Sequence, residues 1–233
     1  MVPPTVVFDL DGTLVDTAPD LVATLNFVFV REGFAPIAYE TARNMVGYGA
    51  RAMIERGLAA QARRLPSDEI ERLFRDFIAY YGEHVADQSR PFAGVEAALD
   101  DIAARGCVLA VCTNKLEHLS VQLLDALGLA ERFAAICGQD TFAVQKPDPE
   151  MLRRTIARVG GRPEAAAMVG DSLTDIAAAK AANIPVVAVD FGYSEAPVAT
   201  LAPDRLVSRF ADVPLAVFEL IAARETMTRT LDR

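Results

Sequence analysis

Short apolar runs alternate with helical segments along most of this chain, and this alternation constrains its fold more than any other feature. Between the runs, apolar residues recur at the spacing of an amphipathic helix, and glycine often follows the last turn. Strands that alternate with helices form βαβ units, in which neighbouring strands are parallel. We therefore expect an α/β protein with a doubly wound, Rossmann-like parallel sheet of about five strands. The expected strands are residues 6–8, 107–112, 133–137, 165–169 and 185–189.

A long helical region interrupts this alternation after the first expected strand. Apolar spacing predicts helices there, and no segment alternates like a strand. The predicted helices are residues 20–32, 39–45, 50–62 and 67–85, and a last helix is predicted near the end of the chain over residues 214–224. A helical block inserted between strands is expected to form a separate lobe that acts as a lid. We therefore predict a Rossmann-like catalytic core of residues 1–16 and 91–233, and a helical cap domain of residues 17–90.

The composition of the 233 residues argues against several classes of partner. The formal net charge of -9 disfavours nucleic acid and anionic membranes. It does not disfavour a small phosphate ester, because a bound metal and nearby lysines set the field of a site. Cys107, Cys112 and Cys137 lie in or beside apolar runs, so buried free thiols and a reducing cytoplasm are expected. The first residues lack a signal-peptide pattern, and no apolar run is long enough to span a bilayer.

Polar side chains follow four of the expected strands. Asp9 and Asp11 come directly after the first strand and share a face, because strand side chains alternate with a period of two. The others are Thr113 and Asn114 after the second strand, Lys146 in the loop after the third, and Asp171 and Asp175 after the fourth. Parallel strands end at one edge of the sheet, where α/β proteins bind their ligands. Two close carboxylates need a cation or a shared proton, and the whole set suits phosphoryl transfer.

Each of these residues also has a purely structural interpretation. Asp9 and Asp11 could belong to an ordinary acidic turn after a strand, and Thr113 could cap the following helix. Lys146 and Asp175 could be solvated surface charges, and Asp171 could belong to a turn or a cap. Their joint occurrence at successive strand ends favours the functional interpretation.

These residues make the chain resemble the haloacid dehalogenase-like superfamily over nearly its whole length. The motifs that carry the resemblance are Asp9-Leu10-Asp11-Gly12-Thr13, Thr113-Asn114, Lys146-Pro147, and Gly170-Asp171-Ser172 with Asp175. A helical cap after the first motif is also typical of that superfamily. Its dehalogenases and phosphonate hydrolases lack the second aspartate, so Asp11 implies a phosphatase or a phosphomutase. Within that group, residues 9–21, 46–50 and 90–95 are similar to the phosphoglycolate phosphatases.

The resemblance implies a chemical role for the aspartates. Asp9 would attack phosphorus to give an aspartyl-phosphate. Asp11 would protonate the leaving oxygen and then activate water for the second step. Mg²⁺ would bind Asp9, the backbone carbonyl of Asp11, and Asp171, with waters completing its coordination.

The resemblance also implies which residues hold the phosphoryl group. Thr113 and the backbone N–H of Asn114 would bind phosphoryl oxygens. Lys146 would pair with the phosphoryl group and with Asp9, while Asp175 would orient Lys146 and the metal ligands.

Arg51 follows the flexible loop that contains Gly47 and Gly49 in the predicted cap. Because arginine is a forked donor, we expect Arg51 to bind the carboxylate of phosphoglycolate; an exposed helical arginine is the alternative. His84 and His118 follow no strand and are expected to be surface or packing residues.

The implied activity is Mg²⁺-dependent hydrolysis of a small phosphate monoester, with 2-phosphoglycolate as the first expected substrate. Alternatives within the superfamily are another sugar-phosphate phosphatase, a pyrophosphatase, and a phosphomutase similar to β-phosphoglucomutase. A non-enzymatic, metal-dependent aspartate receiver is a further alternative, but the long inserted cap argues against it. We expect a small phosphorylated metabolite as partner, no nucleic acid or membrane, and a monomer or homodimer in the cytoplasm.

Overall fold

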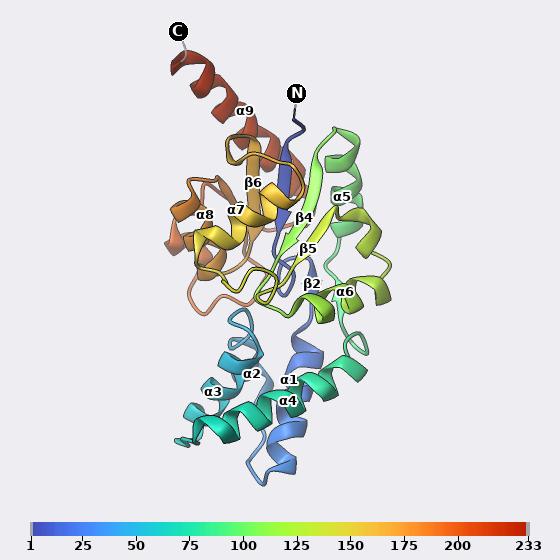
Figure 1. Ribbon diagram of the computed structural model, residues 1–233, viewed down its shortest axis with the longest axis vertical. Coiled ribbons are helices and arrows are strands. Elements are labelled where there is room, and N and C mark those ends of the chain that lie inside the picture. The colour runs from blue at the N-terminus through green and yellow to red at the C-terminus, as the bar shows by residue number, and fades with distance from the viewer. Residues whose placement is uncertain (1, 232–233) are drawn as a thin grey trace.

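The computed structural model describes residues 2–231 and consists of a sheet-containing core and a helical block, as Figure 1 shows. The core contains a six-stranded sheet with the order β5-β4-β1-β6-β7-β8, in which every neighbouring pair is parallel. Its strands are β1 (Thr5–Phe8), β4 (Val108–Cys112), β5 (Ala135–Cys137), β6 (Ala166–Gly170), β7 (Val186–Val189) and β8 (Arg205–Val207). The central strand β1 lies between β4 and β6, so the residues after these three strands meet at one edge of the sheet.

Helices cover both faces of this sheet. The core helices are α5 (Val95–Ala104), α6 (Glu117–Ala126), α7 (Pro149–Arg158), α8 (Leu173–Ala182) and α9 (Val213–Leu231). Short 3-10 helices occur at Ala130–Arg132, Pro163–Ala165, Val198–Leu201 and Phe210–Asp212. In β1, Val6 and Phe8 pack with the buried residues of α5 and α9, whereas Val7 packs with those of α7 and α8. Alternate side chains of one buried strand therefore supply the apolar layers on opposite faces.

The predicted α/β fold class is confirmed, and some of its elements differ from the prediction. The sheet has one strand more than the expected five, because β8 was missed. Two of its three residues are exposed, so this edge strand has no apolar run that would reveal it. The last helix continues to Leu231 rather than ending at Arg224.

The helical block follows β1 and lies beyond the carboxyl ends of the strands (Figure 1). Its helices are α1 (Ala18–Arg31), α2 (Tyr39–Arg43), α3 (Ala50–Ala60) and α4 (Ser67–Glu83). The chain enters and leaves the block through a two-stranded antiparallel pair, β2 (Val15–Asp16) and β3 (Arg90–Pro91). These crossings coincide with the boundaries predicted from the sequence, while the division into two domains stays a prediction.

The buried carboxylate of Asp20 connects the segment that enters the helical block with the segment that leaves it. It accepts hydrogen bonds from the backbone N–H groups of Gln88 and Ser89 and from Ser89 Oγ, at 2.7–3.0 Å. The first turn of α1 is thereby tied to the segment that returns to the core.

The three cysteines lie as the sequence predicted. Cys107, Cys112 and Cys137 are free and buried. Among the residues that the structure describes, no helix is both long enough and apolar enough to cross a membrane.

Candidate active site

A buried lysine joins two of the predicted carboxylates. Lys146 Nζ lies 2.7 Å from Asp9 Oδ1 and 2.6 Å from Asp175 Oδ1, and all three side chains are almost fully buried. Asp9 comes directly after β1, and its N–H donates to Val169 of β6, which keeps it in line with the sheet. Burial alone would lower the pKa of Lys146, but the charges of Asp175 and Asp9 raise it above its usual value, so the side chain stays an ammonium.

Asp171 is held by two donors from different parts of the chain. Thr13 Oγ1 donates to its Oδ1 at 2.8 Å, and the backbone N–H of Tyr193 donates to its Oδ2 at 2.7 Å. Asp171 directly follows β6, and Thr13 belongs to the turn after β1. The carboxylate is therefore oriented before any ligand is bound.

Two glycines allow the backbone to come this close to Asp171. Gly12 has φ +88°, and a Cβ there would lie 2.5 Å from Asp171 Oδ2. A Cβ on Gly192 would lie 2.2 Å from the same oxygen. Any larger residue at either position would displace the carboxylate.

The acidic residues fit a divalent cation. Asp9, Asp171 and Asp175 each offer a carboxylate oxygen, and these oxygens lie within 4.8 Å of one another. Desolvation by burial, followed by the charge of Asp175, raises the pKa of both Asp9 and Asp171 above the usual carboxyl range. Asp9 Oδ1 contacts Lys146 but forms no hydrogen bond of good geometry, so the oxygen can still bind a cation. Hard oxygen ligands and excess negative charge suit Mg²⁺.

Asp11, the second predicted aspartate, pairs with Lys115, a residue that was not predicted from the sequence to belong to the site. Lys115 Nζ lies 2.9 and 3.2 Å from the two carboxylate oxygens of Asp11, and both side chains are buried. Lys115 directly follows Thr113-Asn114, so its place after a strand end was the available signal. That position fits an ordinary helix-start loop equally well, and only the fold brings Lys115 to Asp11.

Thr113 and Asn114 are buried where β4 ends. The N–H of Thr113 donates to Cys137, and its Oγ1 accepts a hydrogen bond from the Lys115 N–H. The Asn114 amide pairs with both backbone groups of Lys146, at 2.9 and 3.1 Å, and donates to Gly47 of the helical block. Asn114 therefore connects the Lys146 loop with the cap.

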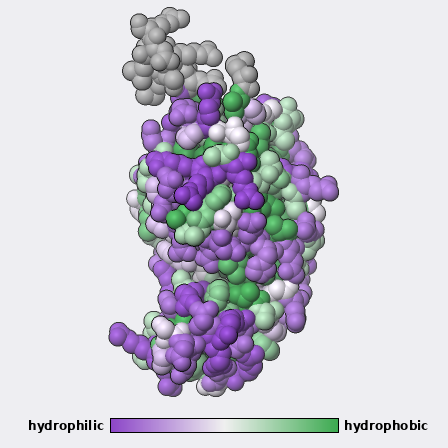
Figure 2. Space-filling view, in the orientation of Figure 1, coloured by the Kyte–Doolittle hydropathy of each residue, from purple (hydrophilic) through white to green (hydrophobic). Residues whose placement is uncertain are grey.

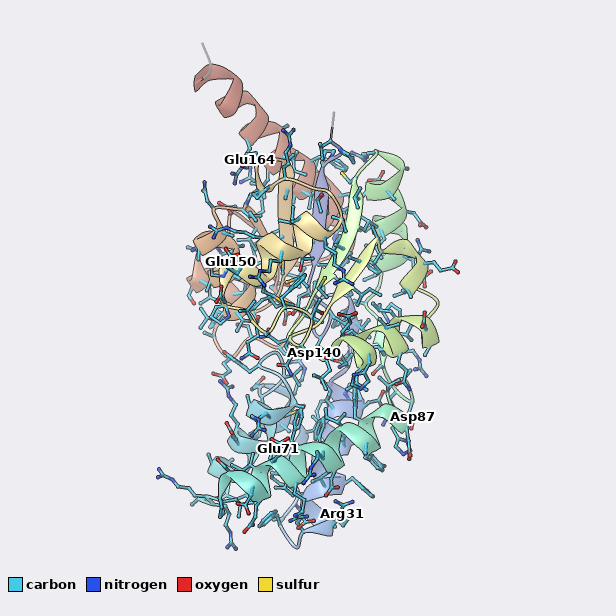
Figure 3. The ribbon with its side chains drawn as sticks, viewed as in Figure 1. Arg31, Glu71, Asp87, Asp140, Glu150 and Glu164 are labelled. Atoms are coloured by element: carbon cyan, nitrogen blue, oxygen red, sulfur yellow. The ribbon has the colours of Figure 1, made fainter. Side chains whose placement is uncertain are left out.

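The structure does not bring Arg51 to this site. Arg51 pairs with Glu71 of α4, and its side chain is 45% exposed. In Figure 3 Glu71 lies within the helical block, whereas Asp140 marks the end of the core that faces the block. The expectation for the histidines agrees with the structure, because the His84 ring contacts Asp87 and Tyr80 at the surface and His118 is exposed.

A small cavity lies between the cap and the core beside Asp11. Its volume is about 30 Å³, and its apolar lining consists mainly of Leu21, Val46, Met53, Phe77, Ile78 and Leu119. Figure 2 shows hydrophobic surface in the band where the block meets the core. Apolar side chains screen charges less than water does, so this lining strengthens the electrostatic interactions of Asp11 and Lys115.

Comparisons with known proteins agree with this geometry. A family model described as haloacid dehalogenase-like hydrolase matches residues 6–189. The chain is 44% identical to the phosphoglycolate phosphatase of Agrobacterium fabrum over 95% of each chain. It is 49% identical to that of Mesorhizobium japonicum, over 89% of this chain and 91% of the relative. A crystal structure described as a predicted phosphoglycolate phosphatase from Haemophilus somnus 129PT has a TM-score of 0.84 at 30% identity, covering 91% of this chain and 96% of its own.

Proposed function

The chain belongs to the haloacid dehalogenase-like hydrolase family, and from that premise we propose that it is a Mg²⁺-dependent phosphatase that hydrolyses 2-phosphoglycolate to glycolate and phosphate. The observation that carries the proposal is the buried group of Asp9, Lys146, Asp171 and Asp175. It combines a nucleophile, a cation fixed by Asp175 and a candidate metal ligand, all beyond the carboxyl ends of three strands. Relatives that match over most of both chains are named phosphoglycolate phosphatases, which supports the substrate.

In the proposed reaction Asp9 is the nucleophile. One of its carboxylate oxygens forms a bond to phosphorus while the bond from phosphorus to the leaving oxygen breaks, and Asp11 gives that oxygen a proton. Asp11 then accepts a proton from water, which attacks phosphorus and releases Asp9 and inorganic phosphate. Asp9, the backbone carbonyl of Asp11 and Asp171 would hold Mg²⁺, which would neutralise part of the negative charge shared by the nucleophile and the ester.

The remaining site residues position the phosphoryl group. Lys146 contacts Asp9 and is placed to pair with phosphoryl oxygens, while Asp175 holds Lys146. The Asn114 side chain is engaged with Lys146 and Gly47, so we assign phosphate binding to its backbone N–H. Thr113 Oγ1 is the second proposed phosphate ligand.

We further propose that the protein works in the cytoplasm as a monomer or homodimer on a small phosphorylated metabolite. The support for a reducing compartment is that all three cysteines are free.

The test is phosphate release by the purified protein with Mg²⁺ across a panel of 2-phosphoglycolate, sugar phosphates and pyrophosphate. We expect 2-phosphoglycolate to have the highest kcat/KM, Asp9→Asn to abolish turnover, and Asp11→Asn to lower it about 10²- to 10⁴-fold. Isomerisation of glucose 1-phosphate would identify a phosphomutase instead. Equal phosphate release by Asp9→Asn would overturn the mechanism.

A further inference from the structure

Lys115 is the one cationic side chain that lines the cavity between cap and core, among the residues that the structure describes. The cap contributes mostly apolar side chains to this cavity, and Asp11 is the other charged group among the described residues that line it. A cation in such a lining interacts strongly with any anionic group that enters, because apolar side chains screen charges less than bulk water does.

Lys115 can donate a hydrogen bond to a ligand while it stays paired with Asp11. An ammonium has three N–H donors, and Asp11 supplies the two oxygens that lie 2.9 and 3.2 Å from Nζ. Nζ also lies 4.5 Å from the centre of the Tyr81 ring, on helix α4 of the cap. The ion pair with Asp11, in which both side chains are buried, stabilises the charged form of Lys115.

The buried hydroxyl of Tyr81 is a second polar group beside Lys115 that could bind an acceptor. Its side chain lines the same cavity and is only 1% exposed, yet its hydroxyl forms no hydrogen bond of good geometry in the part of the chain that the structure describes. Burial raises the pKa of this phenol to about 12, so it remains a donor. A buried hydroxyl without a partner costs stability, and an acceptor bound in the cavity would remove that cost.

We propose that Lys115 and Tyr81 form a carboxylate site that selects phosphate esters whose leaving alcohol carries a carboxylate beside the scissile oxygen. This inference rests on the proposed function, in which Asp11 protonates the leaving oxygen. In 2-phosphoglycolate the carboxylate carbon is two bonds from that oxygen, so a group that contacts Asp11 can also reach the carboxylate. A carboxylate accepts several hydrogen bonds, and the ammonium and the phenol supply donors of suitable charge.

The size of the cavity agrees with a short leaving group. A volume of about 30 Å³ holds a few heavy atoms but not a sugar ring. Arg51, the cation that the sequence suggested for this role, pairs with Glu71 and does not line the cavity.

The test compares two esters of equal length, 2-phosphoglycolate and 2-hydroxyethyl phosphate, which differ in whether the leaving alcohol carries a carboxylate or a hydroxyl. The variants are Tyr81→Phe, which keeps the ring beside Lys115, and Lys115→Met, which keeps most of the side-chain stem. Matched controls are Tyr80→Phe, the neighbouring residue on α4, and Lys180→Met, an exposed lysine of α8.

We expect Tyr81→Phe to lower kcat/KM for 2-phosphoglycolate about 10- to 100-fold, mainly through KM, and to leave 2-hydroxyethyl phosphate within threefold. Lys115→Met should lower both, because it also removes the partner of Asp11, but the ratio between the two substrates should fall at least tenfold. Neither control should change that ratio. Thermal unfolding of each variant checks that it is folded, and glycolate inhibition of the wild type and Tyr81→Phe gives a second readout for binding alone.

The outcomes separate this inference from the proposed function. If wild-type protein hydrolyses 2-phosphoglycolate but both variants keep the wild-type substrate ratio, the carboxylate site is wrong and the phosphatase stands. If turnover depends on Asp9 but 2-hydroxyethyl phosphate is preferred by the wild type, the carboxylate site is also wrong. If no ester is hydrolysed in an Asp9-dependent manner, the proposed function itself fails, and the carboxylate site fails with it.

Discussion

The backbone N–H of Tyr193 donates a 2.7 Å hydrogen bond to Oδ2 of Asp171, a predicted metal ligand. The hydroxyl of the same tyrosine donates to Asp16 at 2.5 Å and accepts from the Ala18 N–H at 3.0 Å. Asp16 and Ala18 lie where the chain enters the cap. One residue thus connects the orientation of the metal ligand with the junction between cap and core.

Tyr193→Phe separates these two connections. The backbone donor to Asp171 is kept, but the buried Ala18 N–H loses its acceptor, so we expect the free energy of unfolding to fall by about 1–3 kcal/mol. Mg²⁺ affinity should change less than threefold. Urea denaturation and Mg²⁺ titration measure the two effects, and a loss of Mg²⁺ binding without a loss of stability would contradict this interpretation.

Lys146→Met tests the charge balance of the buried site. Asp9 and Asp175 would lose the ammonium that both contact, so we expect the free energy of unfolding to fall by about 3–5 kcal/mol without Mg²⁺. Added Mg²⁺ should restore part of this loss, because it neutralises the same carboxylates. Denaturation with and without Mg²⁺ measures this, with Lys180→Met as the matched exposed lysine. Equal stability of the two variants would show that the pairing contributes little.

Gly12→Ala tests the close approach of the backbone to Asp171. Its added Cβ would lie 2.5 Å from Asp171 Oδ2, and displacing that oxygen should weaken Mg²⁺ binding about 10- to 100-fold. Gly106→Ala is the matched control, because its φ of +84° imposes similar backbone strain while no other atom lies within 4 Å of the new Cβ. Isothermal titration with Mg²⁺ distinguishes the two, and similar affinities would argue that the clash is relieved elsewhere.

Mg²⁺ affinity should rise with pH. Burial, and then the charge of Asp175, raises the pKa of Asp9 and of Asp171, so protons persist in the metal-free site above the usual carboxyl range. The metal binds the deprotonated forms, so binding must release these protons and the Kd falls as pH increases from about 6 to about 8. Calorimetry in buffers of different ionisation enthalpy counts the protons released. A value of zero at about pH 6 would contradict the predicted pKa direction.

Arg51→Ala separates the sequence-based hypothesis from the structure. A carboxylate-binding Arg51 predicts a selective loss on 2-phosphoglycolate. The exposed pair with Glu71 predicts instead an unchanged ratio between 2-phosphoglycolate and 2-hydroxyethyl phosphate, with a loss of stability below about 1 kcal/mol. Steady-state kinetics on both substrates decide between them.

Local periodicity was enough to predict the α/β class, most of the elements, the strand ends before Asp9 and Asp171, and the loop after β5 that contains Lys146. Parallel strands end at one edge, so residues after β1, β4 and β6 converge once their order is known. Strand β8 escaped prediction because it is a short edge strand, two of whose three residues are exposed, and pairing with β7 rather than its own pattern makes it a strand.

The sequence by itself therefore determined that Asp9, Thr113 and Asp171 directly follow strands, because that depends only on the spacing of residues along the chain. Only the tertiary structure decided which cation meets which carboxylate. Lys146 pairs with Asp9 and Asp175, and Lys115 pairs with Asp11 below Tyr81 of the cap. These partners lie 29 or more positions apart, and no local preference encodes a contact that arises when separate segments pack together.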